Sequence, residues 1–153
     1  MKFKYLLVWT FVIFINSMSI GLASSSCRIA EGRLNFGKFD NFSSDTSTKT
    51  VGEIRVICSN MTGDVNYSLA LTNTNLSLNN GKGGLLSYKL FTTGNYTSLW
   101  NETNLITGTV RNVGGNGVDV KPIYGEVILL NKQRMTAGDY TNQSNPPLVK
   151  LLY

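Results

Sequence analysis

The sequence predicts an all-β protein folded as a single antiparallel β-sandwich. Three observations carry this prediction. Short runs alternate between apolar and polar residues, helical periodicity is weak after the first 23 residues, and stretches rich in glycine and asparagine separate the runs. Alternation with a period of two is typical of half-buried strands. About six such strands in roughly 130 residues, separated by turns, fit a sandwich.

The expected strands follow one another along the chain. They are residues 34–36, 54–58, 67–71, 86–90, 123–130 and 148–153. In the second run, the alternation places Ile54, Val56 and Cys58 on one face, which is expected to point into the core. The run 123–130 is more continuously apolar, and this pattern suits a more deeply buried strand.

The segments between these runs carry residues that favour turns. Residues 79–84 and 114–117 consist mainly of asparagine and glycine, which adopt a positive φ at low cost. Neither segment has the spacing of a phosphate-binding loop, and neither clearly joins a strand to a helix. We therefore expect both segments to be surface turns.

The first 23 residues have the pattern of a secretory signal peptide. Lys2 and Lys4 form a positive start, residues 5–15 are almost wholly apolar, and residues 17–23 are small and more polar. Cleavage is expected after Ala23, which leaves a mature chain of residues 24–153. The alternative is an uncleaved membrane anchor, although polar residues interrupt the apolar stretch.

Composition argues for a binding or structural role. The 153-residue chain has no histidine, so it lacks the commonest general base and metal ligand, and we expect no enzyme activity and no cofactor. Without Lys2 and Lys4, 12 basic residues face 9 acidic ones, and the mature charge is +3. No cluster of Lys or Arg predicts nucleic-acid binding.

The only two cysteines, Cys27 and Cys58, are expected to form a disulfide. An exported chain enters an oxidising compartment, where two cysteines tend to pair. The closed loop of about 32 residues would stabilise the fold by roughly 3–4 kcal/mol in the chain-entropy view. Two free thiols are the alternative.

Five segments match, in order, the landmarks of one known family. They are a Phe-Gly-x-aromatic-Asp sequence within 34–40, a Gly-x-Ile-x-Val-x-Cys strand within 51–59, a Leu-x-Tyr-x-Leu-aromatic segment at 86–91 followed by Trp100, Tyr-Gly-Glu-Val at 124–127, and Ala-Gly-Asp-Tyr at 137–140. Over Cys27 to Tyr140 the chain resembles the spore coat protein U family.

This resemblance implies a fold and a function. The family includes subunits of archaic chaperone–usher pili, which resemble an immunoglobulin-like sandwich lacking its final strand. It implies three partners: a periplasmic chaperone that lends a strand, an outer-membrane usher, and a neighbouring pilin subunit whose N-terminal extension replaces that strand. It also implies the Cys27–Cys58 pairing. We therefore expect an adhesive fibre subunit at the cell surface, secreted through the periplasm and in contact with membrane only through its signal peptide.

The last expected strand is the candidate contact for the chaperone or the donor strand. Its contact residues are predicted to be Leu148, Val149, Leu151 and Tyr153, with Val149, Leu151 and Tyr153 on one face. Two prolines at 146–147 interrupt the segment before it, and proline cannot donate to a ladder, so this strand should start after Pro147 and be short. A donor that buries four or five large side chains would contribute on the order of 10 kcal/mol.

Cleavage after Ala23 would leave only three serines, residues 24–26, before Cys27. So short a stub cannot donate a strand, and in head-to-tail assembly a subunit that only receives a strand sits at the tip. The alternatives are a coat or secreted relative outside any fibre, or a different chain start.

Other side chains receive plainer interpretations. Five aspartates are expected to cap turns because most lie beside Gly, Asn, Ser or Thr; they are Asp40, Asp45, Asp64, Asp119 and Asp139. Tyr96, Leu99 and Trp100 could form an adhesive loop, but Trp100 matches a family landmark and is expected to pack in the core. The second functional hypothesis is a stand-alone secreted or spore-coat sandwich that binds carbohydrate or a surface.

Overall fold

A computed structural model describes residues 24–36, 47–128, 140–142 and 145–153. Within this part of the chain there are eight strands and no helix. The strands are β1 (Ser26–Arg33), β2 (Ser47–Ser59), β3 (Val65–Leu71), β4 (Leu76–Asn79), β5 (Leu85–Phe91), β6 (Ile106–Val110), β7 (Asn116–Ile128) and β8 (Val149–Leu152). Nothing in these ranges is a helix long and apolar enough to cross a membrane. The predicted signal peptide lies outside the described residues.

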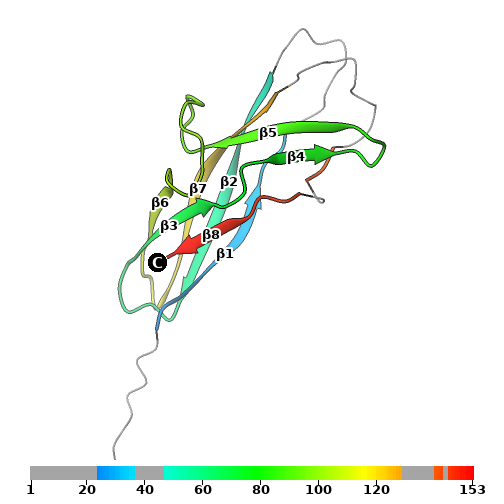
Figure 1. Cartoon of the computed structure of the whole chain (residues 1–153). Coiled ribbons are helices and arrows are strands. Elements are labelled where there is room, and N and C mark those ends of the chain that lie inside the picture. Colours follow the sequence, from blue (N-terminus) through cyan, green and yellow to red (C-terminus); the bar gives the residue numbers. More distant parts are fainter. Residues whose placement is uncertain (1–23, 37–46, 129–139, 143–144) are drawn as a thin grey trace, which may run out of the picture.

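The strands form two antiparallel sheets packed as a sandwich (Figure 1). The first sheet has five strands in the order β1-β2-β7-β5-β4, and the second has three in the order β6-β3-β8. The predicted all-β sandwich is therefore confirmed. Strands β1 and β8 lie near each other in Figure 1, but each is the edge of its own sheet and they do not pair.

The core lies between the inner faces of the sheets. Ile54, Val56 and Cys58 alternate into it from β2, as predicted. The largest fully buried side chains are Trp100, Leu69, Leu71, Val56, Val110 and Val127, together with Cys58. Alternation thus decides which side chains of each strand are withdrawn from water.

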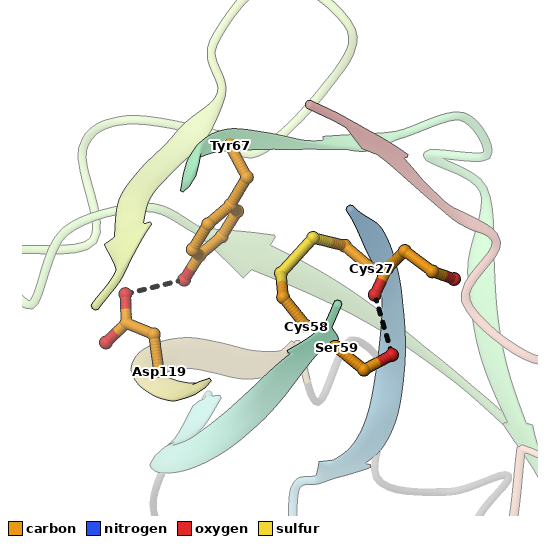
Figure 2. Close-up of a disulfide and its surroundings, with 6 residues drawn as sticks. Cys27, Cys58, Ser59, Tyr67 and Asp119 are labelled. Carbon is orange, nitrogen blue, oxygen red and sulfur yellow. Dashed lines mark hydrogen bonds between the residues drawn. A yellow bond between two sulfur atoms is a disulfide. The ribbon is translucent and has the colours of Figure 1, made fainter. Parts of the chain in front are cut away.

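The disulfide joins β1 to β2 at one end of the first sheet (Figure 2). Cys27 and Cys58 are direct partners in the register, with their Cα atoms 4.1 Å apart. This pairing confirms the prediction. It fixes the start of β1, an edge strand that has only one neighbour to hold it.

Strands β2 and β7 are longer than their apolar runs. They pair over 13 residues each, from Ser47↔Ile128 to Ser59↔Asn116. The strand predicted at 123–130 therefore starts earlier than expected, at Asn116. Residues such as Val118 and Val120 continue the ladder although their side chains are exposed, so the apolar run alone did not show the start of the strand. Residues 129–130 lie outside the described residues.

Both predicted glycine-rich segments contain turns. Positive φ angles occur at Gly81 and Gly83 in the first, and at Gly114 and Gly115 in the second. The second turn is closed by main-chain bonds between Val113 and Asn116. It is shorter than expected, since Asn116 and the residue after it already belong to β7.

The prediction of a strand at residues 34–36 is wrong. After β1 these residues turn and pass over the inner face of the first sheet. A Cβ atom on Gly52 of β2 would lie 2.0 Å from the Arg33 carbonyl oxygen, and one on Gly125 of β7 would lie 2.6 Å from Leu34. Glycines in both strands leave room for the crossing, so the segment packs on the core instead of pairing along an edge.

Candidate functional site

A cleft of about 1310 Å³ opens between the two sheets. One wall consists of β1 residues and of the segment that crosses the first sheet: Ile29, Gly32, Arg33, Leu34, Asn35 and Phe36. The opposite wall consists of residues that precede and begin β8: Tyr140, Thr141, Asn142, Pro146, Pro147, Leu148, Val149 and Lys150. The cleft therefore lies between the edges of the two sheets.

The floor of this cleft is apolar. Ile54, Leu90, Trp100 and Ile123 line it, and all four belong to the buried core. The indole Nε1 of Trp100 donates a hydrogen bond of 2.9 Å to the Leu69 carbonyl, which orients the ring and satisfies its only donor. An occupant of the cleft would thus meet hydrocarbon and aromatic surface.

Each long rim of the cleft includes an unpaired strand edge, β1 on one side and the start of β8 on the other. Strand β1 pairs only with β2, and β8 pairs only with β3. A strand edge presents main-chain N–H and C=O groups that can pair with another extended segment. An apolar floor between two such edges is a geometry suited to strand addition.

Side-chain amides bond the wall that leads into β8 to the β3–β4 connection. Asn73 accepts from the Leu148 N–H at 2.7 Å and donates to the Pro146 carbonyl at 3.0 Å. Asn145 Nδ2 donates to the Asn75 carbonyl at 2.6 Å. These bonds fix an irregular segment against the rest of the fold.

The far end of this wall is tied to β4. Main-chain bonds run in both directions between Asn79 and Thr141, at 2.7 and 2.9 Å. Tyr88 on β5 lies beneath, and burial raises the pKa of its hydroxyl despite a smaller opposing effect of Asn142. Burial thus favours the neutral form of this hydroxyl.

A polar cluster of residues that do not line the cleft lies between the sheets, and Figure 2 shows two of its members, Tyr67 and Asp119. The Tyr67 hydroxyl donates to Asp119 Oδ2 at 2.9 Å, and Lys121 Nζ lies 3.3 Å from the same oxygen. Burial, reinforced by the neighbouring carboxylate, raises the pKa of Tyr67 well above its ordinary value. A Cβ on Gly108 would meet all three side chains, so β6 packs tightly over them. This cluster cross-links the sheets.

The turn-capping interpretation is therefore wrong for Asp119, which lies within β7 and bonds across the sandwich. Asp64 does fix a loop, because its Oδ1 accepts from the Asn112 N–H at 2.8 Å. Asp40, Asp45 and Asp139 lie outside the described residues. Among the described residues, no group of three or more His, Cys, Asp or Glu side chains could hold a metal ion.

The structure separates the four predicted contact residues of the last strand. Leu148 and Val149 line the cleft, and Leu151 packs against the core on the same side as Val149. Tyr153 does not join them: its side chain is 61% exposed, beyond the end of β8, and borders a shallow depression lined by residues of β3 and β6. Strand β8 is short and starts after Pro147, as expected.

Tyr96, Leu99 and Trp100 do not form one exposed loop. Trp100 is only 2% exposed, which confirms that it packs in the core. The Tyr96 ring packs against Phe91 and Tyr124, and its hydroxyl donates to the Thr50 carbonyl at 3.1 Å. Leu99 alone of the three predicted residues is exposed.

Most of the residues that surround the cleft carry no pattern in the sequence that assigns them to a site. Ile29 and Gly32 belong to a strand that was not predicted, and Leu34 and Phe36 were assigned to the wrong kind of element. Two glycines in predicted strand regions, Gly52 and Gly125, could have indicated that another segment crosses the sheet there. An isolated glycine in a strand often marks a close approach of another backbone.

One comparison with known proteins identifies a relationship. The family model described as Spore Coat Protein U domain matches residues 17–144, which is most of the chain and includes β1 to β7. No curated protein matches the chain.

Proposed function

Because this chain belongs to the Spore Coat Protein U domain family, we propose that it is a subunit of a bacterial surface fibre completed by an extended segment from a partner. The family includes pilus-like fimbrial subunits, and its members are structural, surface or secreted proteins. The observation that carries the proposal is the apolar cleft flanked by two unpaired strand edges, β1 and β8.

The physical basis is strand addition. An inserted strand can place alternate side chains on the floor formed by Ile54, Leu90 and Trp100 while its main chain pairs with an edge. Each large apolar side chain so buried contributes roughly 1.5–3 kcal/mol. Several such contacts are comparable with the stability of a whole domain, about 5–15 kcal/mol. The partner strand would therefore supply a large share of the stability of the folded subunit.

Three partners follow in this proposal. A periplasmic chaperone occupies the cleft during export, an outer-membrane usher accepts the complex, and the extension of a neighbouring subunit takes the cleft in the fibre. The protein would then act in adhesion at the cell surface, reached through the periplasm. Adhesion and biofilm formation are consequences of fibre assembly and need no chemical turnover.

The test is co-purification with a periplasmic chaperone of the chaperone–usher type, expressed together with this protein in the periplasm. Val149→Asp places a charge on the cleft side of β8, and we expect it to abolish co-purification. Leu152→Asp, on the opposite face of the same strand, is the matched control and should co-purify normally. A wild-type domain that is a monomer of high thermal stability when expressed alone would contradict the proposal and favour a stand-alone binding protein.

Position in the fibre depends on the mature N-terminus. A chain cleaved after Ala23 receives a strand without giving one, as a tip subunit does. Mass spectrometry of the secreted protein tests this prediction directly. An extension of ten or more residues before Cys27 would contradict it and indicate a subunit that also donates.

A further inference from the structure

We infer that Pro146 and Pro147 restrict main-chain pairing on one side of the cleft, so that an inserted strand receives N–H donation from β8 only at Val149 and Leu151. The inference rests on the proposed function, because it concerns the strand that fills the cleft. It identifies Pro147 as a residue that determines the register and affinity of that strand.

The direction of each main-chain group in β8 follows from its pairing with β3. Thr72 N–H donates to the Leu148 carbonyl at 2.9 Å, so Leu148 faces β3. In an antiparallel pair, alternate residues exchange bonds with the neighbour, and the residues between them face away. Lys150 and Leu152 therefore face β3 as well, and Val149 and Leu151 present their N–H and C=O groups to the free edge.

Directly before Val149, residues 145–148 of this wall have no free main-chain N–H group. The Leu148 N–H donates to Asn73, and the Asn145 N–H donates to the Asn142 carbonyl at 3.0 Å. Pro146 and Pro147 have no N–H group. Four consecutive residues that border the cleft or adjoin it thus lack a free main-chain donor.

Pro147 occupies the position where the ladder would otherwise continue. The carbonyls on both sides of it, those of Pro146 and Leu148, accept bonds from Asn73 and Thr72. Pro147 lies between these two residues, two positions before Val149, and therefore faces the cleft, which it lines. It offers a carbonyl there but no donor.

The free edge of β1, on the opposite rim, can supply some of the main-chain pairing that residues 145–148 cannot. The Cα atoms of Cys27 and Cys58 are 4.1 Å apart, a separation typical of a pair that does not exchange main-chain bonds. By alternation, Ile29 also faces away from β2, toward the free edge of β1. Ile29 lines the cleft, so the inserted strand can pair with β1 alongside the prolines.

The inference predicts a gain of affinity from a proline substitution. Pro147→Ala restores one N–H at the rim, and one additional neutral hydrogen bond should tighten binding by about two- to tenfold. Pro146→Ala is the matched control, because its new N–H would face the Asn73 side and leave affinity unchanged. The probe is a synthetic 14-residue peptide of alternating valine and threonine with a lysine at each end, titrated against the full-length secreted protein.

A second measurement needs no variant. On binding of the same peptide to the wild-type protein, amide hydrogen exchange at Val149 and Leu151 should slow, and exchange at Asn145 and Leu148 should stay the same. Equal affinity for Pro147→Ala and wild type, or unchanged exchange at Val149 and Leu151 in the bound protein, would overturn the inference while leaving the proposed function standing. Failure of the wild-type protein to bind the peptide would overturn strand addition itself.

Discussion

The close approach of the chain to Gly52 leads to a sharp prediction for stability. A Cβ atom at this position would lie 2.0 Å from the Arg33 carbonyl oxygen and 2.8 Å from Leu34 Cδ1. The first of these atoms is backbone and cannot rotate away, so Gly52→Ala must separate the chain segments by about 1 Å or more. Overpacking of this kind costs about 1–3 kcal/mol, and a backbone clash belongs at the upper end. We expect a loss of about 3 kcal/mol.

Equilibrium urea unfolding of the secreted protein measures this loss, and the melting temperature should fall by about 10 °C. Gly32→Ala is the control, since its nearest neighbour, Ile54 Cγ1, lies 4.0 Å from the added carbon. Gly32 is also a strand glycine, and alanine there should be neutral or slightly stabilising. If Gly52→Ala unfolds at the same urea concentration as Gly32→Ala, the crossing of residues 34–36 over β2 is wrong.

Three further variants test other contacts that stabilise the fold. Replacing Cys27 and Cys58 together by alanine opens a loop with a sequence separation of 31 and should cost about 3–4 kcal/mol; a reductant should have no further effect on that variant. Tyr67→Phe removes the hydrogen bond to Asp119 and should cost about 1–2 kcal/mol at neutral pH. Folding raises the pKa of the Tyr67 hydroxyl above its ordinary value of 10.0, so its stabilising contribution is present below pH 10 and is lost as the pH rises further. Between pH 8 and pH 10.5, the free energy of unfolding should therefore fall less in Tyr67→Phe than in wild type. Trp100→Phe removes a buried hydrogen bond of 2.9 Å and should cost about 2–3 kcal/mol, and an unchanged urea midpoint would contradict the role of the indole.

The strands that the sequence predicts well are those with one clearly buried face. In β2, β3 and β5 every second residue enters the core, so alternation is visible without any structure. Three strands were missed for separate physical reasons. Strand β1 shifts register between Ile29 and Glu31, which interrupts its alternation, while β4 has only four residues and β6 is largely polar between its end residues.

The cleft could be predicted only in outline. Its rims, β1 and β8, are separated by more than a hundred residues, and no local pattern shows that two edges lie opposite each other. Resemblance to a family supplied the expectation of a missing strand and of contacts at Leu148 and Val149. Tyr153 was expected to continue the alternation of Val149 and Leu151, but β8 ends at Leu152 and Tyr153 lies beyond it.

The floor of the cleft is already buried, and this determines which contacts contribute to the binding free energy of an inserted strand. Ile54, Leu90 and Trp100 are each no more than 3% exposed in the protein as described, so an occupant withdraws little further floor surface from water. Most of the gain of roughly 1.5–3 kcal/mol per position must therefore come from burial of the occupant's own side chains. Hydrogen bonds add less, because the wall at Pro147 lacks donors. Affinity should thus follow the size and fit of the partner's alternate side chains more closely than the length of its main-chain ladder.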